Sequence, residues 1–210
     1  MTNDPTFWNK IAPKYAARPV DDQSAYEQKL ELTRKLFKAD FVVAEFGCGT
    51  GTTALRHAEH VKHVWATDGS EKMIDIAWEK AQSQGIENAI FEVADIDDYQ
   101  PERGQFDVVM MHSLLHLLKD RRAAIEKARC MLKPGGYFVT NTVCISGVSR
   151  LMWPVIGLMR FLGQAPMVKF FSGKALREEI EAAEFQITEY WRPNDGMAVF
   201  IIAQKPDTTA

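Results

Sequence analysis

The sequence has few cysteines and no excess of basic residues. Its three cysteines, Cys48, Cys130 and Cys144, lie far apart without a CxxC pair, so by themselves they suggest neither a disulfide framework nor a zinc site. A reducing compartment, and hence a cytoplasmic protein, is the expectation. The formal net charge of -3 argues against a nucleic-acid partner, because proteins that bind nucleic acid usually carry a basic face.

Targeting and membrane signals are also missing. Residues 1–5 lack the basic and apolar regions of a signal peptide, so none is expected. The most apolar stretch, Leu151–Phe171, contains two prolines together with Arg160 and Lys169. A spanning helix needs about 20 mostly apolar residues with few charges, so we expect no transmembrane segment.

What the sequence does have is an alternation of short apolar runs with longer helical patterns. The 210 residues predict a single domain, residues 1–210, with a full-sized core. Continuous apolar runs separated by helices are typical of a parallel sheet that is covered on both faces. The expected strands are 41–46, 63–67, 89–93, 106–111 and 137–140. The expected helices between them are 52–60, 70–85 and 121–132.

The last third of the chain departs from this alternation. Residues 145–173 form an apolar insertion punctuated by glycine and proline, which we expect to cover the substrate. A helix over 174–184 and strands over 186–191 and 197–203 follow, with Asp195-Gly196 as a turn signal between the two strands. The predicted fold is therefore α/β: a doubly wound, Rossmann-like, mostly parallel sheet with an antiparallel C-terminal edge hairpin.

A glycine-rich loop follows the first strand. Gly47, Gly49 and Gly51 form the pattern GxGxG, and Glu45 stands two residues before it. Glycine lets a ligand approach the backbone closely, and the next helix offers unpaired N–H groups. A dinucleotide would use GxGxxG and place its pyrophosphate at that helix, where Glu45 would repel it. A ligand that carries an ammonium and a sulfonium suits Glu45 better.

Further acids follow the next two strands. Asp68 comes about 20 residues after the loop, where a carboxylate can accept from both hydroxyls of a ribose. Asp95 follows the third strand and could accept from the exocyclic amine of adenine, with Ile96 packed on the ring. The simpler alternatives are a helix N-cap for Asp68 and a turn role for Asp95. Three acids at the carboxyl edge of one sheet nevertheless favour a shared binding site.

Five segments of the sequence resemble, in their order and spacing, those of the class I S-adenosylmethionine-dependent methyltransferases. The matching segments are 43–51, 66–73, 93–96, 106–109 and 132–137. Residues 7–15 look like the N-terminal helix of the small-molecule branch, the methyltransferase type 11-like proteins, in which a tyrosine closes over the cofactor. The resemblance extends over roughly residues 7–143.

The resemblance implies S-adenosyl-L-methionine as cofactor and S-adenosyl-L-homocysteine as product. Successive segments would hold the methionine part, the ribose and the adenine. In this family a bulkier apolar residue often follows the acid that binds the ribose, whereas Gly69 follows Asp68 here. The implied cofactor-binding residues are Tyr15, Glu45, Gly47, Gly49, Gly51, Asp68, Gly69, Met73, Asp95, Ile96 and His112, with Ser113 beside His112 at the reacting centre.

Methyl transfer from a sulfonium is an in-line displacement, which needs alignment above all. A base is needed only when the acceptor must lose a proton, and the catalytic candidates are His112 and His116, since histidine titrates near neutrality. They share one face if that segment is helical. Paired histidines also occur at metal sites, but no third ligand is placed nearby and no metal is expected. His57, His60 and His63 are interpreted as surface residues.

The expected acceptor is a small molecule, lipophilic or aromatic. Methionines and aromatics of the segment 151–163 fit an adaptable apolar cavity. The same segment also fits a core helix, a homodimer surface or a helix that rests on a membrane surface. Many enzymes that methylate exocyclic or amide nitrogens have an Asn/Asp-Pro-Pro-Tyr/Phe run after the fourth strand, and this sequence lacks it, which argues against DNA, RNA or glutamine as acceptor. Quinone C-methylating relatives usually have an Arg-Asn pair at this place, where the sequence has Met111-His112-Ser113. The sequence therefore does not single out a quinone.

Two other functions stay open at this point. A nicotinamide-dependent oxidoreductase would need GxGxxG, but Thr52 stands where the last glycine belongs, and a catalytic Tyr-xxx-Lys is absent. A non-catalytic S-adenosylmethionine-binding protein would hold the same cofactor without transferring its methyl group.

Overall fold

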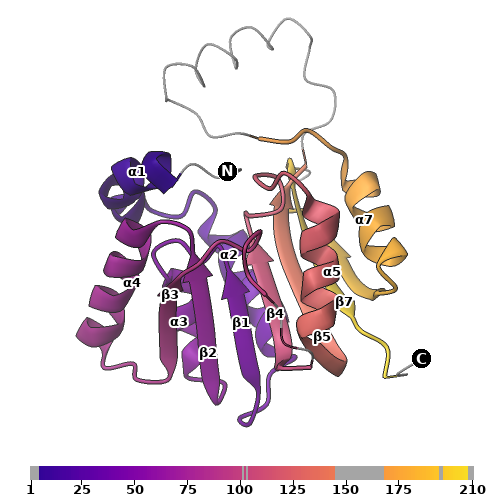
Figure 1. The fold of residues 1–210 in the computed structure, drawn as a ribbon, viewed down its shortest axis with the longest axis horizontal. Coiled ribbons are helices and arrows are strands. Elements are labelled where there is room, and N and C mark those ends of the chain that lie inside the picture. Colours follow the sequence, from indigo (N-terminus) through magenta and orange to yellow (C-terminus); the bar gives the residue numbers. More distant parts are fainter. Residues whose placement is uncertain (1–4, 101, 103, 145–167, 194–195, 208–210) are drawn as a thin grey trace, which may run out of the picture.

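The computed structural model describes residues 5–100, 102, 104–144, 168–193 and 196–207. In this part of the chain, seven strands form one sheet in the order β3-β2-β1-β4-β5-β7-β6 (Figure 1). Neighbouring strands from β3 to β5 are parallel, whereas β7 is antiparallel to both β5 and β6. The predicted mostly parallel α/β sheet with an antiparallel C-terminal hairpin is therefore confirmed. The strands are β1 Val42–Phe46, β2 His63–Asp68, β3 Ala89–Val93, β4 Phe106–His112, β5 Leu132–Val143, β6 Gln186–Trp191 and β7 Ala198–Gln204.

Helices cover both faces of the sheet. Residues of α3 and α4 pack into one buried cluster with a face of the sheet, and residues of α5 and α7 pack into a second cluster on the opposite face. Helix α1 lies across the carboxyl ends of the strands, above α4 (Figure 1). The helices are α1 Pro5–Ala17, α2 Gln23–Arg34, α3 Thr52–Ala58, α4 Glu71–Gln84, α5 Arg121–Met131 and α7 Gly173–Ala182.

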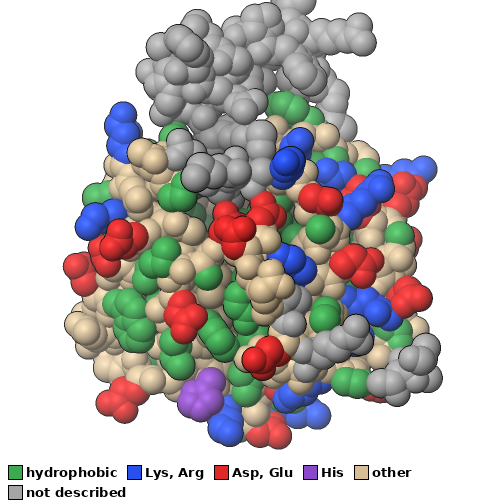
Figure 2. Space-filling view, in the orientation of Figure 1, with side chains coloured by type: hydrophobic (Ala, Val, Ile, Leu, Met, Phe, Trp, Pro, Cys, Tyr) green, Lys and Arg blue, Asp and Glu red, His purple; other side chains and the backbone are tan. Residues whose placement is uncertain are grey.

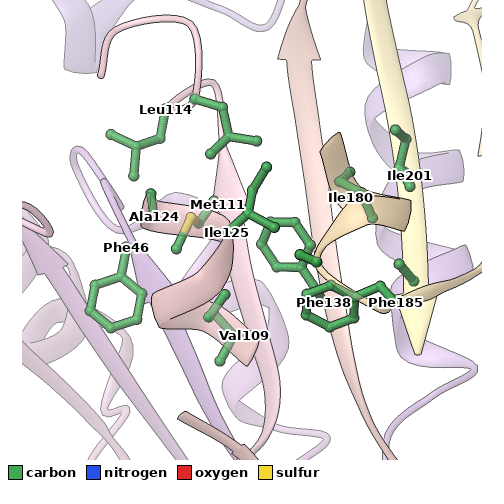
Figure 3. Close-up of a cluster of buried hydrophobic side chains, with 14 of the residues drawn as sticks. Phe46, Val109, Met111, Leu114, Ala124, Ile125, Phe138, Ile180, Phe185 and Ile201 are labelled. Atoms are coloured by element: carbon green, nitrogen blue, oxygen red, sulfur yellow. The ribbon is translucent and has the colours of Figure 1, made fainter. Parts of the chain in front are cut away.

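The two clusters follow from the alternation of side chains along each strand. Val109 and Met111 of β4 point toward α5, where Ile125 and Phe138 complete the packing shown in Figure 3. Met110, their neighbour in β4, points to the other face and packs with residues of α3 and α4. Each of these side chains is at most 1% exposed, and burial of one such side chain contributes roughly 1.5–3 kcal/mol.

Local signals set most element ends. Ser70 caps α4, accepting from the Met73 N–H at 3.2 Å, and the left-handed Gly85 ends that helix, as the sequence predicts. Helix α3 ends at Ala58, two residues earlier than expected. Strand β5 begins at Leu132 rather than at residue 137, because Leu132 already pairs with Phe106 across the sheet.

Two features near the N-terminus were not predicted. Helix α2 begins after Asp22, whose side chain accepts from the Ala25 N–H at 2.9 Å. Asn9 ties α1 to the start of α4, since its Oδ1 accepts from the Ser70 hydroxyl at 2.7 Å and from the Lys72 N–H at 3.1 Å. Both features bring N-terminal residues to the edge of the sheet where the strands end.

Part of the expected insertion lies outside the described residues, namely 145–167 of the segment 145–173. After it, the Lys169 N–H donates to the carbonyl of His116 at 2.7 Å. Residues 194 and 195 of the expected hairpin turn also lie outside, and the Gly196 N–H donates to the Pro193 carbonyl at 2.7 Å. Among the described helices, none has the length and apolar character needed to cross a membrane.

Helices α5 and α7 are joined by a nearly buried carboxylate. Glu179 accepts from Arg121 at 2.6 and 2.7 Å and from Arg122 at 3.2 Å. The Glu179 side chain is 7% exposed and that of Arg121 is 21% exposed, so water screens their interaction only weakly.

We therefore expect Glu179→Gln to lower the free energy of unfolding in urea by about 1–3 kcal/mol, because it leaves Arg121 without its charged partner. Glu178→Gln is the control, since its contact with Lys174 is 3.7 Å long and mostly exposed. The control should change stability by less than about 0.5 kcal/mol. Equal losses of stability in the two variants would show that Glu179 does not stabilise the contact between α5 and α7.

Candidate active site

A cavity of about 950 Å³ lies at the carboxyl ends of the first four strands, bordered by α1 and α2. A parallel sheet places ligand sites at this edge, where its strand order reverses. Acidic and basic side chains are interspersed on the face shown in Figure 2, and neither sign forms a broad patch there among the described residues. The predicted site residues that line the cavity are Tyr15, Glu45, Gly47, Gly49, Asp68, Gly69, Met73, Asp95, Ile96, His112, Ser113 and His116.

The glycine loop shapes one wall of this cavity. Gly47 has φ +70°, a backbone conformation that L side chains rarely adopt, and a Cβ there would lie 2.9 Å from Leu114 Cδ1, so a substitution would strain the loop. Gly51 differs from the other predicted cofactor residues because it does not line the cavity. It has φ +71°, and a Cβ there would lie 2.7 Å from Phe91 and 2.8 Å from Ala77. Gly51 therefore allows the loop and α3 to pack closely against α4 and β3.

Asp68 holds the loop in place. Its Oδ2 accepts from the Gly49 N–H and its Oδ1 accepts from the Ser70 N–H, both at 2.9 Å. Burial raises the pKa of Asp68, and these two hydrogen bonds oppose that shift. Ser70, rather than Asp68, supplies the side-chain N-cap of α4. Each carboxylate oxygen has a second lone pair that can accept from a ligand hydroxyl.

Glu45 is the most unusual group in the cavity. It is 2% exposed, and its Oε2 has no hydrogen-bond partner among the described residues. Burial, and then the nearby charge of Asp68, raise the pKa of Glu45 to about 8. Buried polar atoms in folded proteins normally have partners, so an unpartnered carboxyl oxygen in a cavity wall fits a hydrogen-bonding cation.

The third acid combines a turn role with a place in the cavity. Asp95 Oδ1 accepts from the Asp97 N–H at 3.0 Å, as in the turn that was the simpler alternative. Asp95 Oδ2 lies on the side of Gly69, 4.0 Å from the position of a Cβ on that glycine. Ile96 and Met73 are almost fully buried beside it, so a flat apolar ring would meet both a carboxylate and apolar side chains here.

Helix α1 adds an aromatic side chain to the cavity. Tyr15 Cε1 lies 3.7 Å from the position of a Cβ on Gly49, and the Tyr15 ring contacts Trp8 edge to face. Burial of its hydroxyl and the charges of Asp68 and Glu45 raise the pKa of Tyr15. Tyr15 therefore lies close to both acids while its side chain stays half exposed.

The two candidate bases lie at the end of β4 and just after it, and they do not share a helix face. His112 is the last residue of β4, and Ser113 then adopts a left-handed φ of 52°. Burial lowers the pKa of both His112 and His116 to about 4, and the charge of Lys29 adds to the shift of His112. The expectation that these histidines titrate near neutrality is therefore wrong, because both are sheltered from water.

Sequence reasoning missed several residues in the cavity wall. His57 is fully buried, so its interpretation as a surface residue is wrong, although His60 is only partly covered and His63 is exposed. The sequence signal for the burial of His57 is its position three residues after the apolar Ala54, which places both residues on the same face of α3. Lys29 of α2 and Asn141 of β5 also line the cavity, and Asn141 Oδ1 is buried without a hydrogen-bond partner among the described residues.

Comparisons with known proteins agree with this geometry. The family model described as "Methyltransferase domain" matches residues 43–136. A ubiquinone biosynthesis O-methyltransferase of Coxiella burnetii is 29% identical over 140 residues, which cover 65% of this chain and 56% of that protein. The chain thus spans little more than half the length of this relative. A demethylmenaquinone methyltransferase of Leptospira interrogans is 27% identical over 228 residues, covering 95% of this chain and 91% of the relative.

A solved structure shares the fold at low sequence identity. Phosphoethanolamine N-methyltransferase 2 of Haemonchus contortus, determined in complex with S-adenosyl-L-methionine, superposes with a TM-score of 0.72 at 17% identity. The match covers 86% of this chain and 53% of that one. Residues 43–136 thus match a methyltransferase domain, and the glycine loop with the acids after β1, β2 and β3 is similar to the cofactor site of the class I S-adenosylmethionine-dependent methyltransferases.

Proposed function

We propose that this protein transfers a methyl group from S-adenosylmethionine to a small, lipophilic or aromatic acceptor. The observation that carries the proposal is Glu45, a buried carboxyl with an unpartnered oxygen in the cavity wall. A cation beside it would lower its pKa from about 8 and leave a charged, hydrogen-bonded pair. A dinucleotide would instead place a pyrophosphate near this acid, and the negative charge of the pyrophosphate would oppose ionisation of Glu45 rather than form an ion pair with it.

The residues of the cavity fit the three parts of the methyl donor. Glu45 would accept from the ammonium of the methionine part, and Asp68 would accept from the ribose hydroxyls. Asp95, with Ile96 and Met73, would surround the adenine. When bound, the cofactor supplies an electrophilic methyl group on a positively charged sulfur.

The acceptor would lie beyond β4 and β5, where the cavity wall is mostly apolar with a few polar atoms. Leu114, Leu117 and Val143 supply apolar surface there. His116 Nδ1 and Asn141 Oδ1 are buried in the same region without hydrogen-bond partners among the described residues, so each could orient a polar group of the acceptor. The names of the two relatives, which concern ubiquinone and menaquinone, support an acceptor with a ring and apolar substituents.

The low pKa of His112 limits the chemistry that it can assist. At pH 7 its imidazole is neutral and can accept a hydrogen bond, but with a pKa of about 4 it is a weak base. We therefore propose an acceptor whose reacting atom loses an acidic proton, as in a phenol or an enol, or loses no proton before transfer. The chain would then contribute mainly alignment and exclusion of water.

Isothermal titration should show that the wild-type protein binds S-adenosylhomocysteine and not NAD. Asp68→Asn should weaken this binding about tenfold or more, because the amide keeps the shape but loses the charge and one acceptor oxygen, a loss of about 1.4 kcal/mol or more. Asp98→Asn is the matched control, since Asp98 is exposed and lies outside the cavity wall. Preferential binding of NAD would refute the proposal.

Methyl transfer itself is tested with a labelled donor and a panel of phenols, catechols and reduced quinones. We expect label in at least one of these acceptors. Tight binding of S-adenosylhomocysteine with no transfer across the panel would favour the alternative of a non-catalytic binding protein over an enzyme for aromatic acceptors.

Glu45→Gln should weaken the binding of S-adenosylhomocysteine and stabilise the folded protein at high pH. In the folded protein Glu45 holds its proton up to about pH 8, whereas in the unfolded chain it loses it near pH 4.5. The folded state thus binds more protons between these values, and this group reduces stability progressively as the pH rises through that window. We expect the variant to unfold like the wild type at pH 4.5, to gain on the order of 2–4 kcal/mol at pH 8, and to bind S-adenosylhomocysteine poorly.

Thermal and urea unfolding across that pH range check this prediction. Glu92→Gln controls for a general charge effect, because Glu92 is an exposed residue of β3. A stability difference between wild type and Glu45→Gln that stays constant with pH would show that the Glu45 carboxyl titrates normally.

A further inference from the structure

The loop after β3 carries two of the residues that the proposed function assigns to the adenine. Asp95 and Ile96 line the cavity shortly after the end of β3, a strand that lies at one edge of the sheet and pairs with β2. Among the described residues between β3 and β4, no α-helix forms. The positions of Asp95 and Ile96 therefore depend on individual contacts of this loop.

Residues 95–99 form an α-turn, a single helical turn that does not continue. The N–H groups of Asp98 and Tyr99 both donate to the Asp95 carbonyl, at 3.1 and 3.0 Å. The Asp95 side chain caps the same turn, since its Oδ1 accepts from the Asp97 N–H at 3.0 Å. One turn of helix is unstable alone, because fixing its backbone costs more free energy than its few hydrogen bonds supply. The rest of the protein must hold it.

Lys127 of α5 holds the far end of this turn. Its Nζ donates to the carbonyls of Ile96 and Asp97, both at 2.7 Å. Carbonyls at the end of a helical turn lack partners within the turn, and a cation there also interacts favourably with the aligned peptide dipoles. A lysine ammonium has three donors, so it can bind both carbonyls at once through charge-assisted hydrogen bonds.

Apolar contacts hold the turn on another side. Ile96 is 4% exposed and belongs to the buried cluster that includes residues of α5. The Tyr99 ring contacts the Phe46 ring edge to face at 5.2 Å. Apolar burial has no preferred direction, whereas hydrogen bonds weaken steeply away from their preferred angles. The apolar contacts thus keep the turn against the core, and Lys127 fixes its rotation.

The rotation of the turn decides where the free oxygen of Asp95 lies. Because Oδ1 is bound within the turn, Oδ2 is the oxygen left on the cavity side, 4.0 Å from the position of a Cβ on Gly69. Lys127 is not among the residues that line the cavity, so its effect on a ligand passes through the turn.

We infer that Lys127 is a positioning residue for Asp95 and thereby gives the cavity its preference for a purine that carries an exocyclic amine. The inference rests on the proposed function, in which Asp95 meets the adenine of the methyl donor. With Lys127 in place, the second carboxylate oxygen of Asp95 is fixed where the amine can donate to it. Without Lys127, the turn rotates about its apolar contacts and this hydrogen bond is lost for part of the time.

Isothermal titration with S-adenosylhomocysteine and its 6-deamino analogue, in which hydrogen replaces the exocyclic amine, tests the inference. The wild type should bind S-adenosylhomocysteine at least about tenfold more tightly than the analogue, because only the amine donates to Asp95. Lys127→Met should weaken S-adenosylhomocysteine at least about fivefold and leave the analogue within about twofold, since the analogue makes no such bond. Lys127→Arg keeps a cation with several donors and should retain most of the preference. Lys119→Met is the control, because Lys119 is exposed and lies outside the cavity wall.

A double-mutant cycle shows whether Lys127 acts through Asp95. Asp95→Asn should itself lower the preference for the amine, because its amide oxygen can still accept within the turn while its NH₂ group faces the amine. In the Asp95→Asn background, Lys127→Met should then change the preference by less than about twofold. If Lys127→Met does not fold, Lys127→Gln takes its place in both experiments.

Hydrogen exchange supplies a readout that needs no ligand. The amides of Asp98 and Tyr99 should exchange at least about tenfold faster in Lys127→Met than in the wild type or in Lys119→Met, because the turn that binds them opens more often. Unchanged exchange of both amides would show that Lys127 does not hold the turn, and the inference would be wrong.

The binding results separate failure of the inference from failure of the proposed function. If the wild type prefers S-adenosylhomocysteine but Lys127→Met keeps that preference, or weakens both ligands equally, the inference is overturned and the proposed methyl donor stands. A wild type that binds both ligands equally well would also overturn it, since Asp95 would then not meet the amine. A wild type that binds neither ligand would refute the proposed methyl donor and the inference with it.

Discussion

The burial of the Glu45 carboxyl beside Asp68 is the constraint on which the site depends. Strand β1 is buried on both faces, so a carboxyl near its end has little water around it and holds its proton to about pH 8. Asp68 stays in position through hydrogen bonds from the glycine loop and from the start of α4. The loop, the next helix and the two acids are thus one unit, which the core on either side of the sheet holds rigid.

Buried polar groups in the cavity wall lower the stability of the folded protein, and the same groups are available to bind a ligand. The carboxyl of Glu45, the imidazole of His116 and the fully buried imidazole of His57 each have a buried polar atom without a hydrogen-bond partner among the described residues. Such groups persist where a ligand supplies the missing partners. The cavity wall carries carboxyl groups as well as nitrogen groups, so it offers hydrogen-bonding partners to a ligand that has polar groups of both kinds.

Sequence alone predicted the features that depend on local pattern. Apolar runs placed the parallel strands, and residues that follow strands in such a sheet must meet at one edge, which is why Glu45, Asp68 and Asp95 were found. Features that depend on packing between distant segments were missed. The burial of His57 depends on α2, which was not predicted, and the low pKa of His112 depends on how completely its neighbours exclude water. The packing of Gly51 against Phe91 is likewise visible only in three dimensions.

The proton balance of donor binding tests the central claim most directly. At pH 7 the Glu45 carboxyl is mostly protonated, so a cation that binds beside it should expel that proton. Titration of S-adenosylhomocysteine in buffers of different ionisation enthalpy measures the number of protons exchanged. The wild type should release close to one proton more than Glu45→Gln. Equal proton exchange in the two proteins would mean that Glu45 does not meet the cation, and the account of the site would be wrong.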